Sequence, residues 1–241
     1  MASGSLVTGR PDLAMEPTWP PAATAQVGPW LIRRGDGGGK RVSAASALRP
    51  ATADDLPMAE AAMAALGQGL LFMLRPEDAA LDRLLAAQGY GVVDPVAIYA
   101  APSARLAALP LGAIAAIPHW PPLEIARDIW AEGGVGTARI AVMDRVSLPK
   151  TAVLGRSSGR AAGVAFVAAT PDIAFLHALE VRPALRRQGT AANMVKMAAR
   201  WAFSQGVEQL ALAVTEANGP ARHLYASLGM VVVGSYHYRQ K

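Results

Sequence analysis

The stretch that decides the fold runs from residue 175 to residue 203 and reads FLHALEVRPALRRQGTAANMVKMAARWAF. Its first residues suit a buried strand, which ends near Pro183. A short basic loop containing Gly189 follows, and then a long segment with the apolar spacing of an amphipathic helix. In this order the free backbone amides at the helix start form a pocket for anions. The stretch therefore predicts a site for a phosphorylated ligand.

The segments around this stretch predict an α+β fold with a mixed α/β sheet. After it we expect a strand at residues 209–214, a helix at 220–228 and a strand at 230–238. Before it, residues 123–132 have a helical pattern that ends at two glycines. Three strand-like runs then follow, at residues 138–146, 151–155 and 163–169.

The chain divides into four parts by composition. Residues 1–18 are expected to be a flexible tail, and residues 19–102 a smaller α/β half. Within this half, residues 30–33 and 41–48 read as two strands joined by a glycine-rich turn. That turn contains Gly39-Lys40, but Arg41 follows where a phosphate loop of the Walker type needs Ser or Thr, so a hairpin is favoured. Residues 103–121 form the connecting segment, and residues 122–241 form the second domain.

Composition excludes several classes of function. The chain has 241 residues, 52% of them apolar and 17% charged, which predicts a compact fold. The absence of cysteine excludes disulfides, thiolate metal sites and a cysteine nucleophile, and no metal site is expected. The charge of +5 suits an anionic cofactor, but the arginines are spread along the chain and do not favour nucleic acid. No secretory signal or membrane span is evident, so a cytoplasmic location is the default.

The loop of residues 186–191, RRQGTA, resembles the acyl-CoA signature [Q/R]-x-x-G-x-[G/A] of the GNAT superfamily of N-acyltransferases. A second segment strengthens the resemblance, because residues 210–230 are similar to the other acyl-CoA segment of the family. The matching positions there are Asn218, Ala221, Leu224, Tyr225, Gly229 and Met230. The resemblance covers residues 122–241 and implies a GNAT-like fold for that half.

The resemblance also implies roles for individual residues. The backbone near Leu179 and Val181 would pair with the pantetheine arm of the cofactor, in a gap between two splayed strands. Asn218 would hydrogen-bond the cofactor, and Tyr225 would protonate the departing thiolate. The diphosphate would lie on Arg186, Arg187, Gln188, Gly189, Thr190 and Ala191. Two alternatives stay open: Tyr225 as a core aromatic, and Asn218 as a helix cap.

A general base is harder to assign. Glu180 is the best candidate because it lies on the strand beside the cofactor loop, yet strand alternation places it opposite His177, Leu179 and Val181. The strand at residues 209–214 offers only alanines where many relatives have a carboxylate. His177 and His237 are fallback candidates, and residues 236–239 either line the acceptor end or form an edge strand.

Residues 86–94, AAQGYGVVD, resemble the end of the second acyl-CoA segment, with Gly89-Tyr90 matching Gly229-Met230. We therefore expect the N-terminal half to be a degenerate GNAT-like unit, with an unrelated extension as the alternative.

The leading functional hypothesis is an N-acetyltransferase in which a primary amine attacks acetyl-CoA directly in a ternary complex. The alternative is a catalytically weak or inactive acyl-CoA-binding protein with a regulatory role. The sequence identifies neither the amine acceptor nor the oligomeric state.

Overall fold

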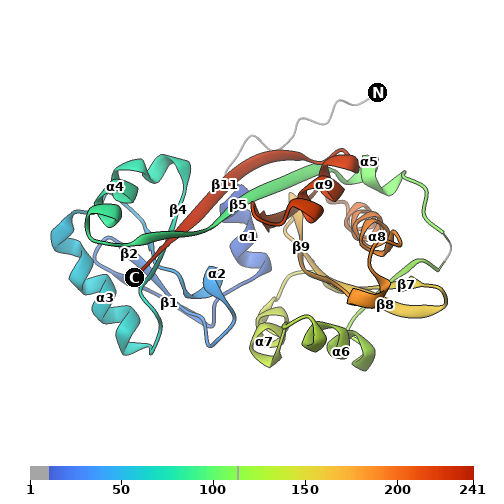
Figure 1. The fold of residues 1–241 in the computed structure, drawn as a ribbon, viewed down its shortest axis with the longest axis horizontal. Coiled ribbons are helices and arrows are strands. Elements are labelled where there is room, and N and C mark those ends of the chain that lie inside the picture. Colours follow the sequence, from blue (N-terminus) through green and yellow to red (C-terminus); the bar gives the residue numbers. More distant parts are fainter. Residues whose placement is uncertain (1–10, 113) are drawn as a thin grey trace. The chain divides into compact units, whose positions relative to one another are not determined.

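The computed structural model describes residues 11–112 and 114–241. Its contacts divide the chain into two compact units. Unit 1 comprises the described part of Met1–Trp19, together with Ile98–Val214 and Asn218–Gly234, and unit 2 comprises Pro20–Ala97, Thr215–Ala217 and Ser235–Lys241. Two long strands, β5 (Gly91–Pro102) and β11 (Val231–Gln240), contribute residues to both units (Figure 1).

Unit 1 contains the stretch of residues 175–203. Its helices are α1 (Pro11–Thr18), α5 (Ser103–Ala107), α6 (Glu124–Glu132), α7 (Thr137–Arg145), the 3₁₀ turn η3 (Pro183–Leu185), α8 (Thr190–Ser204) and α9 (Gly219–Ser227). Its strands, besides the shared β5 and β11, are β6 (Ala116–His119), β7 (Lys150–Ser157), β8 (Arg160–Ala169), β9 (Ile173–Val181) and β10 (Gln209–Thr215).

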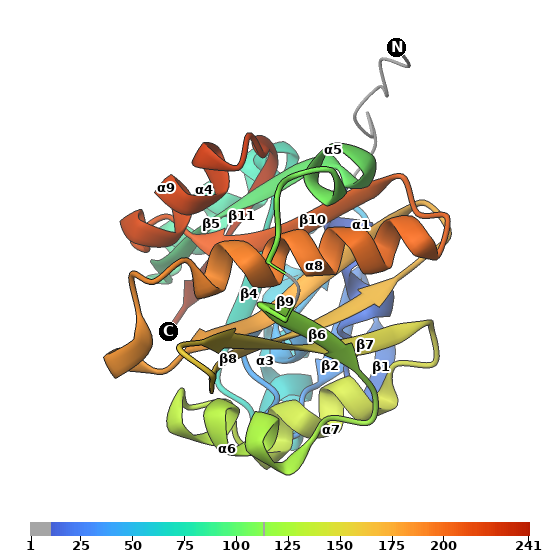
Figure 2. The ribbon, with the colours of Figure 1, turned by 90° about the vertical axis from the view of Figure 1, so that its right-hand side faces the viewer.

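The sheet of unit 1 has the strand order β11-β5-β10-β9-β8-β7-β6. β6, β7, β8 and β9 pair antiparallel in sequence, whereas β9 and β10 are parallel. Helices α6 and α7 lie on one side of β7–β9 and α8 lies on the other (Figure 2). Because both faces are covered, β8 is buried from Ala162 to Ala169 without alternation. The predicted mixed sheet is confirmed.

Residues 138–146 do not form the strand that their β-branched residues predict. They lie in α7, where Ile140 and Met143 are buried. These two residues are three apart and so face the same side of a helix. Packing against the rest of unit 1 therefore decides the conformation of a segment whose local preference is weak.

The expected flexible tail is wrong for residues 11–18, which form α1, while residues 1–10 lie outside the described residues. Met15 and Thr18 are buried, at 2% and 0% exposure. The Thr18 hydroxyl donates to the Met15 carbonyl at 2.7 Å and lies 2.9 Å from His177 Nε2. Because a hydroxyl has one proton to give, His177 is the donor in the second bond. This contact holds α1 against β9 and gives His177 a structural role.

Unit 2 is the smaller α/β unit. Its small sheet consists of β1 (Ala23–Val27), β2 (Trp30–Arg34) and β3 (Ser46–Ala47), in that order. The strand β4 (Leu71–Leu74) is the edge strand of the larger sheet, which begins in the order β4-β11-β5. Its helices are α2 (Lys40–Ser43), η1 (Ala53–Asp55), α3 (Leu56–Ala65), η2 (Pro76–Asp78) and α4 (Ala79–Ala87). Of the strand expected at residues 41–48, residues 41–43 lie in α2 instead, and Ser46–Ala47 form the strand β3. The Lys40 ammonium pairs with Asp94 at 2.5 Å.

The two units share a strand–helix–strand ending. Gly89 after α4 and Gly229 after α9 both adopt left-handed backbone angles, with φ of 83° and 76°. In each case the next amide donates to a carbonyl five residues back, from Tyr90 to Leu85 and from Met230 to Tyr225, both at 3.0 Å. This is the same helix-terminating bond in both places. The resemblance between the two endings therefore extends to their backbone conformation, and the degenerate GNAT-like unit stays a prediction.

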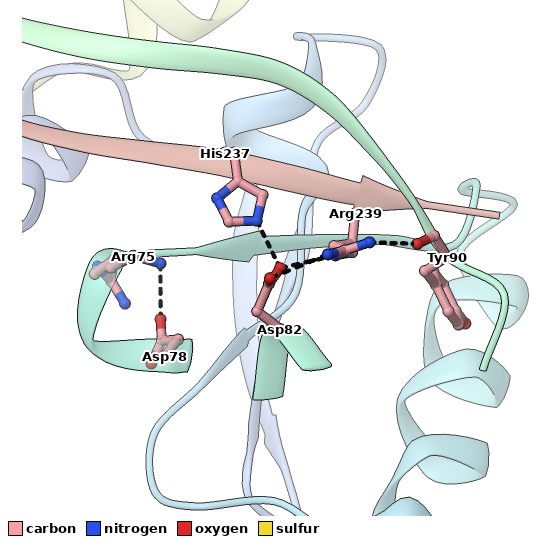
Figure 3. Close-up of polar contacts among 6 residues, drawn as sticks. All are labelled: Arg75, Asp78, Asp82, Tyr90, His237 and Arg239. Atoms are coloured by element: carbon pink, nitrogen blue, oxygen red, sulfur yellow. Dashed lines mark hydrogen bonds and ion pairs between the residues drawn. The ribbon is translucent and has the colours of Figure 1, made fainter. Parts of the chain in front are cut away.

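A charged cluster in unit 2 joins α4 to β11 (Figure 3). The Asp82 carboxylate accepts from Arg239 Nε and Nη2 at 2.7 and 3.0 Å, and it lies 2.7 Å from His237 Nε2. Arg239 also donates to the Tyr90 carbonyl at 2.8 Å. Hydrogen bonding by Arg239 lowers the pKa of Asp82 to about 2, against the opposing effect of burial, with a smaller contribution from His237.

Replacing Asp82 by Asn should destabilise the protein in a pH-dependent way. A depressed carboxyl pKa contributes stability above its unfolded value, and that stability is lost as the pH falls from about 4 to about 2. Because the pair is partly exposed, we expect a loss of about 1–2 kcal/mol near pH 7. Urea unfolding should show the two proteins converging near pH 2. Asp36→Asn, in the exposed pair with Arg34, is the control and should change stability by less than about 0.5 kcal/mol. A constant difference at all pH values would contradict this account.

Along the described ranges 11–112 and 114–241, no helix combines the length and apolar character needed to cross a membrane.

Candidate active site

A cleft lies where β9 separates from β10. The two strands pair in register from Ile173 with Gln209 to Leu176 with Leu212, and β9 then continues to Val181. The cleft at this end has a volume of about 720 Å³. It is lined by Leu179, Glu180, Val181, Leu185, Arg186, Arg187, Gly189, Thr190, Ala191, Ala192, Asn218, Pro220, Ala221, His223, Leu224, Tyr225 and Ser227.

One end of the cleft is formed by the loop before α8. Arg187 and Gly189 both have left-handed backbone angles, with φ of 63° and 80°, and α8 begins at Thr190. Arg186 Nε donates to the Val181 carbonyl at 3.0 Å, which ties the loop to the end of β9. The first amides of an α-helix have no acceptor within the helix and carry a partial positive charge. This end therefore presents backbone donors and two arginines to the cleft.

Two polar side chains near this loop do not face the cleft with a free polar group: Gln188 bonds Ser157, and Thr190 is buried. The Gln188 side chain accepts from Ser157 Oγ at 2.5 Å, and Gln188 is not among the lining residues. Thr190 is 2% exposed, and its Oγ1 has no hydrogen-bond partner among the described residues. A buried hydroxyl without a partner is energetically unfavourable.

A bulge in β9 changes which face each residue occupies. Phe166 on β8 pairs with His177 and Val164 pairs with Glu180, so two residues of β9 lie opposite Ala165. The bulged residue Ala178 has a φ of 47°. Because directly paired residues share a face, as do residues two apart in a regular strand, Glu180 lies on the same face as His177. The alternation expected from the sequence, with Glu180 opposite His177, is wrong because it assumed a regular strand.

Glu180 is half-buried in the cleft wall. Burial raises the pKa of its carboxyl, while the positive charges of Arg186 and Arg139 oppose that rise. A carboxyl with a raised pKa binds a proton more readily near neutral pH. Glu180 is therefore suited to accept a proton, which agrees with its candidate role as a base.

Tyr225 lies on α9 and is 6% exposed. Its ring packs against Tyr99, with centroids 5.9 Å apart. Burial, and secondarily the charge of Glu180, raise the pKa of Tyr225 to about 12. The hydroxyl is therefore protonated throughout the physiological range. Glu180 and Tyr225, the two candidate catalytic residues, line the same cleft.

Asn218 caps α9, because its Oδ1 accepts from the Ala221 amide at 3.1 Å. It also lines the cleft, so the capping interpretation and the ligand interpretation are compatible. His223 lines the cleft as well, although the sequence did not single it out. The helical spacing of Pro220, His223 and Ser227 is the signal that would have found it.

Comparison with known proteins agrees with this geometry. Residues 123–230 match the model of the Acetyltransferase (GNAT) family. These residues form a GNAT domain. A search of curated proteins found no match.

Solved structures similar to this chain extend beyond the GNAT domain. One is a GCN5-related N-acetyltransferase from Kribbella flavida, with a TM-score of 0.75 and 20% identity, covering 98% of this chain and 95% of that one. Another is a tandem GNAT protein from the clavulanic acid biosynthesis pathway, with a TM-score of 0.62 and 14% identity, covering 95% and 86%. At these identities the likeness establishes the fold. The GNAT fold predicted from the sequence is confirmed, and the likeness covers nearly the whole chain.

Glycines let α8 of the GNAT domain approach the sheet closely. A Cβ on Gly155 would lie 2.7 Å from Met194 Cγ, and one on Gly163 would lie 2.9 Å from Met194 Cε. The Gly163 Cβ would also lie 2.6 Å from the Glu180 carbonyl oxygen. These two glycines therefore let α8 pack closely on β7 and β8, and Gly163 also lets β8 approach β9.

The cleft of the GNAT domain gathers most of the predicted site residues. Leu179, Glu180, Val181, Arg186, Arg187, Gly189, Thr190, Ala191, Asn218 and Tyr225 all line it, and Gln188 lies beside it. Of the fallback bases, His177 bonds Thr18, and His237 belongs to the Asp82 cluster of unit 2. Among the residues that the structure describes, no three His, Asp or Glu side chains are arranged to hold a metal ion.

Replacing Gly163 by Ala should destabilise the GNAT domain by about 1–3 kcal/mol, because its new methyl group would overlap a backbone carbonyl that cannot move aside. Thermal and urea unfolding would measure the loss. Gly69→Ala is the control, since a Cβ there meets open space and Gly69 has no left-handed angle. It should leave stability unchanged or raise it by about 0.5 kcal/mol. Equal stability of the two variants would contradict the close approach of β8 and β9.

Proposed function

We propose that this protein is an N-acetyltransferase that transfers the acetyl group of acetyl-CoA to a primary amine by direct attack. The observation that carries the proposal is the shared cleft. It unites the bulged end of β9, the basic loop at the start of α8, a half-buried carboxyl and a protonated tyrosine. Each of these features has a function in acyl transfer from a thioester of CoA.

The loop before α8 suits the diphosphate of CoA. The left-handed angles at Arg187 and Gly189 support a turn whose amides converge, and the start of α8 adds its dipole. In this proposal Arg186, Arg187, Gly189, Thr190 and Ala191 bind the diphosphate, with Gln188 supporting the loop through Ser157.

The remaining cleft residues suit the acyl arm. Beyond Leu176, β9 is no longer in register with β10, so its backbone groups are available to an extended ligand. The backbone of Leu179 and Val181 would pair with pantetheine, and Asn218 would contribute its amide while it caps α9. The same cleft without transfer would serve an acyl-CoA-binding regulatory protein, which is the alternative that turnover assays exclude or support.

The proton steps follow from the two titratable groups. The amine must be neutral to attack, so Glu180 accepts a proton from it. The neutral amine attacks the thioester carbonyl, and the new C–N bond gives a tetrahedral intermediate. As this intermediate collapses, the C–S bond breaks and the second amine proton passes to solvent. Tyr225 donates to the departing sulfur and is reprotonated from solvent. The products are an N-acetyl amide and free CoA thiol.

The two groups influence each other by charge. The negative charge of Glu180 is a secondary cause of the raised pKa of Tyr225. Proton uptake by Glu180 therefore favours proton donation by Tyr225.

Acetyl-CoA should raise the melting temperature of the protein, because a ligand that binds only the native state stabilises it. At about 100 times Kd the gain is about 2.7 kcal/mol. Arg186→Glu should remove most of the shift, since it places a negative charge beside the diphosphate site. Arg160→Glu makes the same charge change at an exposed residue outside the cleft lining and should keep the shift. Equal shifts in both variants would contradict the assignment of the loop.

Replacing Tyr225 by Phe should leave acetyl-CoA binding within about twofold and lower kcat by about 10²-fold or more, because it removes only the proton donor. The measurement is thiol release from acetyl-CoA with a panel of amines, alongside a calorimetric titration. Tyr90→Phe is the control, since it removes a hydroxyl bound to Glu60 in unit 2 and should keep wild-type turnover. Tight binding without turnover by the wild-type protein would favour the regulatory alternative.

A further inference from the structure

The C-terminal part of α6 contacts the chain before, at and after Glu180. The Trp130 indole donates to the Ala178 carbonyl, Gly133 lies against Glu180, and Glu132 pairs with Arg182, which directly follows β9. Of the three contacted residues, Glu180 lines the cleft. One helix end thus touches the whole segment that carries the candidate base.

Trp130 holds the bulge itself. Its indole nitrogen donates to the carbonyl of Ala178 at 2.8 Å, and the side chain is fully buried. A bulge leaves one residue outside the strand ladder, and a buried carbonyl without a partner is unfavourable. The indole N–H supplies that partner at the residue whose φ is 47°. The bond therefore stabilises the conformation that puts Glu180 on the α6 side.

Gly133 provides the space for the Glu180 side chain. A Cβ built on Gly133 would lie 2.7 Å from both Cγ and Cδ of Glu180 and 2.8 Å from Oε2. Gly133 has a φ of −84°, so a larger residue would meet no backbone strain there. A larger residue at position 133 is therefore disfavoured only by its contact with the Glu180 side chain.

Glu132 fixes the strand beyond Glu180. Its two oxygens accept from Arg182 Nη2 and Nε at 2.7 and 2.9 Å, and Arg182 also donates to the Ala161 carbonyl on β8 at 3.2 Å. A bidentate pair of this kind has a defined orientation. β9 is therefore held by α6 on both sides of Glu180.

We propose that Trp130 and Gly133 are positioning residues for acyl transfer, because they set the β9 bulge and the place of the Glu180 carboxylate. The inference rests on the proposed function and adds to it the contacts that position the candidate base, Glu180, in the cleft. Trp130 acts through the backbone of Ala178, and Gly133 acts through the space it leaves.

The charged and titratable groups that influence Glu180 come from three elements. Arg139 lies on α7, Arg186 lies in the loop before α8, and Tyr225 lies on α9. Neither Trp130 nor Gly133 carries a charge, so changing them leaves these groups in place. An altered pH profile in either variant would therefore report a movement of Glu180.

The first test is Trp130→Phe, which keeps an aromatic ring and removes the indole N–H. The matched control is Trp30→Phe, because Trp30 is also fully buried and donates to a backbone carbonyl, that of Asp55, at 2.9 Å in unit 2. Trp130→Phe should lower kcat roughly 3- to 10-fold, the factor expected for one hydrogen bond. The acid limb of its kcat–pH profile should move to lower pH, because Glu180 becomes less buried and its pKa falls. The control should keep both values.

A binding measurement accompanies the kinetics. Calorimetry compares acetyl-CoA with 3′-phospho-ADP, a fragment of CoA that lacks pantetheine. Trp130→Phe should weaken acetyl-CoA roughly threefold or more and leave 3′-phospho-ADP unchanged, because the bulge touches only the acyl-arm end. A general loss of folding would weaken both ligands together.

The second test is Gly133→Ala, which displaces the carboxylate without removing the bulge bond. It should lower kcat in the wild-type background and have little further effect in a Glu180→Gln background, as a double-mutant cycle would show. Additive effects would overturn the role of Gly133.

The outcomes separate this inference from the proposed function. If the wild type turns over but Trp130→Phe matches Trp30→Phe in kcat, acid limb and affinity ratio, the inference is wrong and the function stands. If the wild type releases no thiol with any amine, the proposed function is wrong. The ratio of the affinities for acetyl-CoA and 3′-phospho-ADP, compared between Trp130→Phe and the wild type, then decides the inference. If the wild type binds neither ligand, both are overturned.

Discussion

The separation of β9 from β10 is the constraint on which the site depends. Two parallel strands satisfy each other's backbone groups only while they stay in register, and here that register ends at Leu176 and Leu212. Beyond that point β9 pairs on one edge with β8 alone. Its other edge faces the cleft, where an extended ligand can complete the ladder. The loop, α8 and α9 then close the space around this edge.

The two units differ at the position that carries the candidate proton donor. Unit 2 repeats the strand–helix–strand ending, and Leu85 stands before Gly89 where Tyr225 stands before Gly229. Leu85 is fully buried among Trp30, Phe72 and their neighbours. The position that holds a hydroxyl in one repeat therefore builds the core in the other. Similar endings can support a fold without supporting the same reaction.

Sequence reasoning found the elements whose signals are local. The amphipathic pattern of α8, the glycine at its start and the proline at the start of α9 are all properties of short segments, and the predicted helices are present there. Seven of the ten predicted residues that line the cleft lie in the two acyl-CoA segments, and the other three lie at the end of the strand before the first segment. The glycines that end α4 and α9 could be recognised from the sequence in the same way.

What the sequence could not give depends on distant contacts. The bulge in β9 carries a hydrogen bond from Trp130 to Ala178, 48 residues away, and alternation alone therefore misplaced Glu180. The strand-like residues of α7 and the tail-like residues of α1 were likewise decided by burial, of Ile140 and of Met15. Local preference is weak in such segments, and the packing of unit 1 overrides it.

The central claim is that residues 179–192 and 218–227 form the two walls of one acyl-CoA cleft. The most direct test is a titration of the isotope-labelled full chain with acetyl-CoA, followed by amide chemical shifts. The account predicts that the largest changes occur at residues 179–181 and 187–192 and in the first turn of α9, with the α3 and α4 segments of unit 2 unchanged. Large changes confined to unit 2, or no changes at millimolar acetyl-CoA, would contradict it.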